Sequence, residues 1–390
     1  MKPVSNILIV GGGPVGATLA LALQTKGIAV TMLEAREQGA AYQDQRALAL
    51  SYGSRLILER LGLWQDLEPQ ATAINTIHIS QRGSFGRARL QAKDHGQPAL
   101  GYVLAYGALC AALDKALSRF KDIQVIYGAE ATAIQPSSAV ATVTFRQANV
   151  EHHLTSTLAV LADGGRSLAD VPGLKRETRH YGHDALVTKV QCELGHDHIA
   201  YERFTPAGPV ALLPNGERDF SLVWTGKQED VSRLLELDDE AFLTRLHAHF
   251  GDRLGRFLKV DRRLAFPLKL SYLSPVTAPH LVVIGNAAQT MHPVAGQGFN
   301  VGLRDAWELS ESIAVNVPAA WGEEAMLKTY QQTRKADTKG GLLFTDFLVH
   351  VFSNDIGGLS GLRAAGLGLL DMVQPVKNRL VSKMSYGSRG

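Results

Sequence analysis

The feature that most constrains this chain is a glycine-rich run near its start. Gly11-Gly12-Gly13-Pro14-Val15-Gly16 lies between an apolar stretch, Ile7 to Val10, and a segment with helical spacing of apolar residues. In a β-α-β unit, Gly11 permits the tight turn, Gly13 lets the backbone approach a pyrophosphate, and Gly16 allows the helix to pack closely on the strand. The free N–H groups and positive dipole end of such a helix favour a bound phosphate.

An acidic residue follows this run at the spacing that a nucleotide site requires. The pattern predicts a strand at residues 6–10, a helix at 15–26 and a second strand at 29–34, which Glu34 closes. The Glu34 carboxylate is placed to accept hydrogen bonds from a ribose hydroxyl, and it would repel a 2′-phosphate. We therefore predict binding of an adenine dinucleotide; the alternative is a glycine-rich structural turn.

Composition narrows the class of protein. The 390 residues are 45% apolar and 20% charged, which is ordinary for a globular protein with a substantial core. The net charge of +3 gives no reason to expect a nucleic-acid partner. With Cys110 and Cys192 as its only cysteines and no signal-peptide-like start, the chain is expected in a reducing compartment, the cytoplasm. No apolar run approaches the ~20 residues that span a bilayer, so any membrane contact is expected to be peripheral.

Periodicity predicts an α/β fold with an insertion. Short alternating segments between residues 180 and 264 predict a mostly antiparallel sheet, and the buried-strand pattern returns at Leu281 to Gly285. Helices are predicted at residues 52–63 and 105–120, from about Asn300 onward, and in the region 329–384. We expect a Rossmann-like FAD-binding domain (1–75, 100–178 and 265–335), an inserted mostly antiparallel β-sheet substrate domain (76–99 and 179–264) and a C-terminal helical region (336–390).

A second glycine-rich block, from Gly285 to Asn300, bears on whether the bound dinucleotide is FAD or NAD. A strand ends at Gly285, a loop follows, and a helix begins near Asn300. This arrangement aims a second helix N-terminus back into the domain, where it can stabilise negative charge on a reduced ring. A nicotinamide enzyme has no need of such a loop, so FAD is the predicted cofactor.

The chain resembles the class A flavoprotein aromatic hydroxylases in three places, in the right order along the chain. The resemblance rests on the N-terminal glycines, on Asp163-Gly164 after an apolar strand, and on the Gly285 to Asn300 block. Within that class, residues 44–51, residues 202–209 and the Gly285 block are most similar to the ubiquinone-biosynthesis hydroxylases. The resemblance implies FAD as cofactor and NAD(P)H as reductant.

The resemblance also implies roles for matched positions. Arg46 would help to hold FAD near the flavin, and Asp163 and Gly164 would line the cofactor groove. Most class A members have Asp at the position of Asn286, where it binds the ribitol or ribose side of FAD; Asn keeps an acceptor and loses the charge. No role is transferred to Ala105 or Tyr106, where relatives often carry a glutamate. Contacts to the isoalloxazine through backbone are expected from Pro293, Gly296, Gln297, Gly298, Phe299 and Asn300.

The implied reaction is hydroxylation of a polyprenylated phenol, similar to 2-polyprenyl-6-methoxyphenol, in ubiquinone biosynthesis. NAD(P)H would reduce the flavin, molecular oxygen would form a flavin hydroperoxide, and the distal oxygen would pass to the ring. One alternative is a soluble class A hydroxylase of a small aromatic acid, although no clear pair of cationic residues for a carboxylate presents itself between residues 180 and 264. Another is a catalytically silent flavoprotein scaffold, which would not need the complete flavin loop at 296–300.

Several side chains leave two interpretations open. His292 could act as an acid or base toward the phenol, or simply order the loop before Pro293. Trp224 could stack on substrate or pack in the core. Other histidines come in pairs that could suggest a metal, but we expect them to face solvent and predict no metal site; they are His152 and His153, His196 and His198, and His247 and His249.

The C-terminal region carries a possible partner signal. Apolar residues at helical spacing precede Pro375, and basic residues with no acidic residue among them follow it. Such a combination suits an anionic membrane surface or a ubiquinone-synthesis complex; the alternative is a helix packed on the FAD-binding domain with a solvated tail. The apolar residues are Leu359, Leu362, Gly366, Leu369, Leu370 and Val373, and the basic ones are Lys377, Arg379, Lys383 and Arg389.

Overall fold

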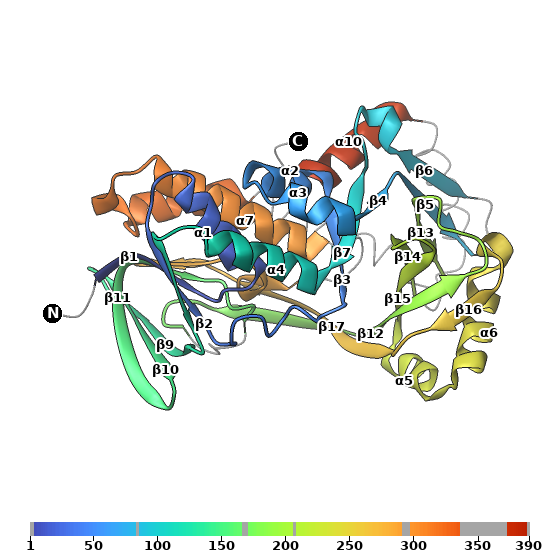
Figure 1. Cartoon of the computed structure of the whole chain (residues 1–390), viewed down its shortest axis with the longest axis horizontal. Helices are drawn as coiled ribbons and strands as arrows, with labels where there is room; N and C mark the ends of the chain where they lie inside the picture. The colour runs from blue at the N-terminus through green and yellow to red at the C-terminus, as the bar shows by residue number, and fades with distance from the viewer. Residues whose placement is uncertain are drawn as a thin grey trace.

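The computed structural model describes residues 4–82, 86–165, 171–205, 208–290, 297–335 and 373–387. The described strands form three sheets, which we call the parallel sheet, the antiparallel sheet and the small sheet. Figure 1 shows the parallel sheet with its helices in one half of the molecule and the antiparallel sheet in the other. The predicted α/β class, with a Rossmann-like part and a mostly antiparallel insertion, is confirmed.

The parallel sheet has the strand order β18-β19-β11-β1-β2-β8, with the β9–β10 hairpin attached to β11. Strands β19, β11, β1, β2 and β8 run parallel, and residues 7–10 of β1 are almost wholly buried. Such continuous apolar strands are typical of a parallel sheet covered on both faces. The bounds are β1 Val4–Val10, β2 Val30–Glu34, β8 Ile123–Tyr127, β9 Glu130–Pro136, β10 Ala141–Gln147, β11 Val150–Leu161, β18 Thr277–Ala278 and β19 Leu281–Val283.

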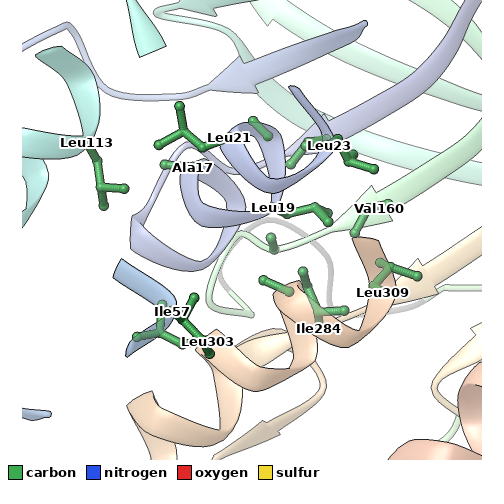
Figure 2. Close-up of a cluster of buried hydrophobic side chains, with 14 of the residues drawn as sticks. Ala17, Leu19, Leu21, Leu23, Ile57, Leu113, Val160, Ile284, Leu303 and Leu309 are labelled. Atoms are coloured by element: carbon green, nitrogen blue, oxygen red, sulfur yellow. The ribbon is translucent and has the colours of Figure 1, made fainter. Parts of the chain in front are cut away.

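Three helices cover one face of this sheet: α1 (Pro14–Gln24), α4 (Tyr106–Leu117) and α7 (Gln297–Ala314). Figure 2 shows α1 at the centre of the cluster, with Leu19 packed among apolar side chains of β11, the strand end at Ile284 and α7. The β9–β10 hairpin covers the opposite face of the sheet with a second apolar cluster. The cofactor half is therefore a three-layer structure.

The antiparallel sheet has the order β20-β17-β12-β15-β14-β13-β5-β6, and β16 pairs with the end of β12. Its pairings are antiparallel except for β13 with β5. Helices α5 (Gln228–Glu236) and α6 (Asp239–Phe250) cover one face (Figure 1). The bounds are β5 Thr76–Gln81, β6 Arg87–Gln91, β12 Arg176–Cys192, β13 Ile199–Phe204, β14 Val210–Asn215, β15 Asp219–Lys227, β16 Phe257–Val260, β17 Leu264–Leu273 and β20 Gln289–Thr290.

The small sheet, in the order β3-β7-β4, lies between the other two. Helix α10 packs on α2 and on β5 and β6, so the end of the described chain contacts both halves. None of the described helices is long and apolar enough to cross a bilayer. The remaining bounds are β3 Ala47–Ser51, β4 Thr72–Ile74, β7 Gly101–Ala105, α2 Tyr52–Arg60, α3 Trp64–Leu67 and α10 Gln374–Tyr386, with short 3₁₀ turns at Glu68–Gln70, Ala92–His95, Asp252–Leu254, Gly285–Ala287 and Pro318–Ala320.

Several expectations from the sequence change here. Helices α5 and α6 lie in a segment that was expected to be sheet alone. Trp224 is buried against Phe242 and His249, so the core-packing interpretation is confirmed. The expectation that the paired histidines face solvent is wrong for His249, whose pKa burial lowers to about 4, and for His196, whose buried ring contacts the Gly216 carbonyl.

The domain division expected from the sequence remains a proposal. Residues 76–81 pair with β13, and residues 87–91 pair with residues 76–81, so both segments belong to the antiparallel sheet. Strand β17 also belongs to that sheet, although residues 265–273 were expected in the FAD-binding domain. Most of the expected C-terminal helical region, residues 336–372, lies outside the described residues; residues 324–335 and 374–386 are helical.

The core around α1 gives a testable prediction. Leu19 is fully buried, so Leu19→Ala should leave a cavity and lower the free energy of unfolding by about 2–5 kcal/mol. Chemical denaturation followed by far-UV circular dichroism measures the change. Leu194→Ala is the control, because that side chain is 54% exposed and should change stability by less than about 0.5 kcal/mol. Equal losses in the two variants would contradict this description of the core.

Candidate cofactor-binding site

Two of the predicted landmarks meet at the carboxyl ends of β1 and β11. Gly11 has φ +105°, and a Cβ on it would lie 2.6 Å from the Cα of Asp163. A Cβ on Gly16 would lie 2.0 Å from the carbonyl oxygen of Gly11. These backbones are in direct contact, so only glycine fits at either position. The positions predicted for a tight turn and for close helix packing do have that geometry.

The N-terminus of α1 fits a phosphate group. Gly13 is the N-cap of α1, Pro14 follows at the first turn, and no side chain caps the helix. Among the described residues, a Cβ on Gly13 would come within 4 Å of the Tyr106 hydroxyl alone, at 3.9 Å. Protein packing therefore does not require glycine here, whereas a pyrophosphate lying against this backbone would. Uncapped N–H groups at a helix start are natural ligands for a phosphate.

Glu34 lies beside this turn as predicted. Its Oε2 accepts a hydrogen bond from the Gly12 N–H at 2.7 Å, and its Oε1 accepts bonds from the backbone and Nε of Arg36. Burial opposes its ionisation, but the hydrogen bonds from Arg36 and Gly12 outweigh burial and hold the pKa of Glu34 below its ordinary value. The carboxylate is thus ionised near neutral pH, where it can accept from a ribose hydroxyl.

Arg36 and Tyr106 belong to the same group of side chains, although no role was expected for them from the sequence. The Tyr106 hydroxyl interacts with Arg36, and the Arg46 guanidinium lies 5.1 Å from the centre of the Tyr106 ring. Arg46 itself is half-exposed and paired with Asp44. The signal that could have found Tyr106 is its place at the start of α4, a second helix whose N-terminus no side chain caps.

The Gly285 turn is held in place by a buried ion pair. Gly285 has φ +62°, and its N–H donates to Oδ2 of Asp305 at 3.0 Å. Asp305 lies on α7, is 3% exposed, and pairs with Arg334, whose Nε donates to Oδ1 at 2.7 Å. Neither charged residue was expected at the site from the sequence. The available signal was an aspartate between the apolar Leu303 and Ala306 on one helix.

Val15 joins the two distant glycine blocks. Its side chain lies against Gly285 and Gly302, where a Cβ would come within 3.1 Å and 2.9 Å of the valine methyl groups. The third landmark is close by: Asp163 accepts a hydrogen bond from Gly165 at 2.8 Å, and a Cβ on Gly165 would lie 3.6 Å from the Asn286 carbonyl oxygen. All three predicted landmarks therefore converge in space.

Other predicted site residues have more varied positions. Asn286 is exposed, and Gly164 has nothing within 4 Å of a Cβ position. Asn300 is buried and braces β3, since its Oδ1 accepts from the Ser51 N–H and its Nδ2 donates to the Ala49 carbonyl. Gln297 opens α7, no described residue lies within 4 Å of a Cβ position on Gly298, and Phe299 packs against the apolar core. His292, Pro293 and Gly296 lie outside the described residues.

The antiparallel sheet turns one of its faces toward this half of the molecule. Ala200 of β13 packs there with Ile74 of β4 and Val103 of β7. Residues that alternate with Ala200, such as Tyr201, pack instead on α6 at the opposite face. We call the face toward the small sheet the inner face of the antiparallel sheet.

Comparisons with known proteins agree with this geometry. A family model described as an FAD binding domain matches residues 5–341. A ubiquinone hydroxylase of Rhodospirillum rubrum is 34% identical, with 99% of this chain and 90% of that protein covered. The 3-demethoxyubiquinol 3-hydroxylase of Escherichia coli K12 is 30% identical, with 93% and 94% covered. The chain belongs to this family of FAD-dependent aromatic hydroxylases.

The fold of this hydroxylase is also that of solved flavoproteins. The crystal structure of p-nitrophenol 4-monooxygenase from Pseudomonas putida DLL-E4 superposes with a TM-score of 0.81 over 100% of both chains, at 17% identity. Family membership agrees with the fit of the α1 N-terminus to a pyrophosphate and of Glu34 to a ribose. FAD is thus the cofactor of the hydroxylase, while the residues assigned to it remain proposals.

Two glycines of the turn should respond differently to a methyl group. Gly13→Ala should weaken FAD binding roughly ten- to a hundredfold, as an overpacking of about 1–3 kcal/mol implies, and leave the apoprotein's melting temperature unchanged. Gly16→Ala should lower both the affinity for FAD and the melting temperature of the apoprotein, because its Cβ would clash with the Gly11 carbonyl. Flavin fluorescence titration and thermal melts measure the two effects.

Gly195→Ala is the matched control for both variants, because nothing lies within 4 Å of its Cβ position. It should match the wild type in both measurements. Unchanged FAD affinity in Gly13→Ala would contradict the assignment of this turn to the pyrophosphate.

Proposed function

We propose that the chain is an FAD-dependent monooxygenase that hydroxylates the ring of a polyprenylated phenol in ubiquinone biosynthesis, with NAD(P)H as reductant. The observation that carries the proposal is the similarity, nearly from end to end, to two enzymes whose names specify hydroxylation in ubiquinone chemistry. The covered share is at least 90% of each relative, so the similarity extends well beyond the nucleotide-binding turns.

When bound, FAD passes two electrons from NAD(P)H to dioxygen, so that one oxygen atom enters the ring and the other leaves as water. The chain's own residues hold the cofactor and orient the substrate. The α1 N-terminus and Glu34 hold the adenosine diphosphate end, and Asp305 fixes the Gly285 turn beside it. The inner face of the antiparallel sheet supplies an apolar surface that limits access of water to the ring.

Three cationic side chains of the inserted segment are engaged elsewhere in the fold, which favours a neutral substrate over a small aromatic acid. An aromatic carboxylate needs a cationic partner in its site. Arg203 lies over the Phe250 ring on the opposite face, Arg253 bonds to His78, and Lys189 is paired with Asp219 at 2.7 Å. A silent scaffold is disfavoured too, because the chain keeps a buried ion pair that holds its second loop in place.

Two measurements test this proposal. The purified protein should bind FAD with an oxidised-flavin spectrum and consume NAD(P)H faster when a prenylated 2-methoxyphenol is added, with a hydroxylated product detectable by mass spectrometry. A strain that lacks the gene should accumulate a polyprenyl methoxyphenol that is one hydroxyl short. Unchanged ubiquinone in that strain would overturn the proposed pathway, and a protein that cannot be reconstituted with FAD would overturn the proposed chemistry.

We further propose that the chain reaches its substrate at an anionic membrane surface through its C-terminal region. The apolar residues between Leu359 and Leu370 lie outside the described residues, but Arg379 and Lys383 of α10 are exposed. Lys377 is buried, so it does not belong to this basic surface. The apolar side of α10, with Leu380 and Val381, packs on the protein and is not available to lipid.

Charge reversal tests this membrane contact. The double variant Arg379→Glu, Lys383→Glu should sediment with phosphatidylserine-containing vesicles at least tenfold less than the wild type, at about 1 kcal/mol per basic residue near the surface. The control reverses two exposed lysines elsewhere, Lys121 and Lys269. Equal sedimentation of the wild type and both variants would show that α10 does not contribute to the contact.

A further inference from the structure

Glu202 occupies an unusual place in the antiparallel sheet. Its strand, β13, pairs with β14 and β5 so that Glu202 lies opposite Ala211 on one side and Ile79 on the other. Directly opposed residues point to the same face of a sheet. The register extends this row across the sheet, and every member lies in the described part of the chain: Leu264, Val187, Val223, Ala211, Glu202, Ile79 and Ala88. Glu202 is the one ionisable residue in an otherwise apolar row.

The row lies on the inner face, toward the cofactor half. Ala200, two residues before Glu202 and therefore on the same face, packs with Ile74 and Val103 of the small sheet. Ile79 packs toward Leu380 and Met384 of α10. The opposite face is closed by α5 and α6. The carboxyl of Glu202 thus projects between the antiparallel sheet and the elements that lie against it from the cofactor side.

The inner face is less completely packed than the outer one. Leu186, Leu212 and Leu222 on the outer face are at most 1% exposed. On the inner face, Ala88, Ala185 and Ala200 are buried, but the apolar row from Leu264 to Ile79 is partly exposed at Leu264, Val187, Val223, Ala211 and Ile79. Phe266, which shares this face two residues along β17, is 44% exposed. An apolar surface left partly open beside a cofactor site is suited to an aromatic ring with an apolar tail.

Among the residues that the structure describes, no charged group lies beside the carboxyl of Glu202. Within the described residues, no hydrogen bond or ion pair reaches the Glu202 side chain, and burial alone raises its pKa to about 7. The neighbouring strands present Ile79 and Ala211 to it, the small sheet presents Ile74 and Val103, and α10 presents Leu380 and Met384. The nearest ion pair on this face, Lys189 with Asp219, lies two strands or more away on β12 and β15.

We propose that Glu202 binds the phenol hydroxyl of the substrate and acts as its base during hydroxylation. This inference rests on the proposed function. The O–H bond of the phenol breaks as a bond forms between its proton and Glu202, and the electron pair stays on the phenol oxygen. The negatively charged oxygen raises the electron density on the ring carbons ortho and para to it. One of these carbons takes up the oxygen atom derived from dioxygen. The substituted carbon loses its hydrogen as a proton to water, and the phenol oxygen recovers its proton from Glu202.

The same carboxylate sets specificity. A desolvated anion accepts a hydrogen bond from a neutral phenol but repels a substrate that carries its own carboxylate. The class of substrate that fits is therefore an uncharged phenol whose apolar substituents lie along the inner row. A benzoate-type substrate would place two anions together in an apolar setting. Glu202 thus favours the hypothesis of a hydroxylase acting on a neutral phenol over that of a hydroxylase acting on a small aromatic acid.

The variant Glu202→Gln tests the proposal, with a short-chain 2-prenyl-6-methoxyphenol as the probe. Gln keeps the size and a hydrogen-bond acceptor but cannot take up a proton. We expect kcat for product formation to fall about a hundredfold or more, with a smaller change in KM. NAD(P)H oxidation should continue and release hydrogen peroxide. In the wild type, kcat should rise with pH through about 7, because the base must be ionised, and this rise should be absent in the variant.

Glu217→Gln is the control, because Glu217 is exposed in the turn between β14 and β15. It should keep the rate and the pH profile of the wild type. If the wild type hydroxylates the probe but Glu202→Gln keeps its kcat and pH profile, the role of Glu202 is overturned while the proposed function stands. If the wild type binds FAD but yields no hydroxylated product from the probe, the proposed function itself fails.

The pH profile of the wild type tests the proposal without the variant, so a folding defect in Glu202→Gln does not affect it. A rate with no rise between pH 6 and 8 would contradict a base of this kind even if Glu202→Gln did not fold. A second readout uses 4-hydroxybenzoate as an anionic competitor. It should inhibit the wild type weakly and Glu202→Gln at least about tenfold more strongly, since the variant carries no opposing charge.

Discussion

The close contact of three backbone turns at the carboxyl ends of β1, β11 and β19 is the constraint on which the rest of the structure depends. These strands are neighbours in the parallel sheet, so Gly11, Asp163 and Gly285 leave it at the same edge. Ligands of open α/β sheets bind at that edge. Val15 fills the space between the first and third turns, and the Asp305–Arg334 pair fixes the third to α7. The N-terminal end of α1 is left open for a phosphate.

Local patterns in the sequence were enough to predict this part of the molecule. Residues 7–10 are apolar without interruption because β1 is covered on both faces, and α1 begins within one residue of the predicted position. Gly11 and Gly16 could be interpreted from the sequence because each is required by a backbone contact that leaves no room for a side chain. The role of Glu34 was predicted from its position at the end of the second strand, at a fixed distance after the glycine-rich run. Asp163 and the Gly285 block followed from the resemblance to a family, and the structure then brought them beside Gly11.

What the sequence could not supply depends on the register between distant strands. Tyr106 approaches Gly13, and Arg334 approaches Asp305, across long stretches of chain that no periodicity connects. Glu202 lay within a segment already noted for its resemblance, but its solitary position emerges only when seven strands are aligned side by side. Helices α5 and α6 were missed because short strands with alternating residues dominate the segment around them.

The order in which the chain is made has a consequence for how the cofactor site is assembled. Strand β1 is made well before its neighbour β11, and most of the antiparallel sheet is made between β11 and the next strand, β19. Helix α10 comes last, and there the Ser385 carbonyl accepts a hydrogen bond from Ser51 at the start of α2. The three turns at the carboxyl ends of these strands can therefore meet only after β19 has been made. Until β11 has been made, the edge of β1 that it will occupy must be kept from premature pairing.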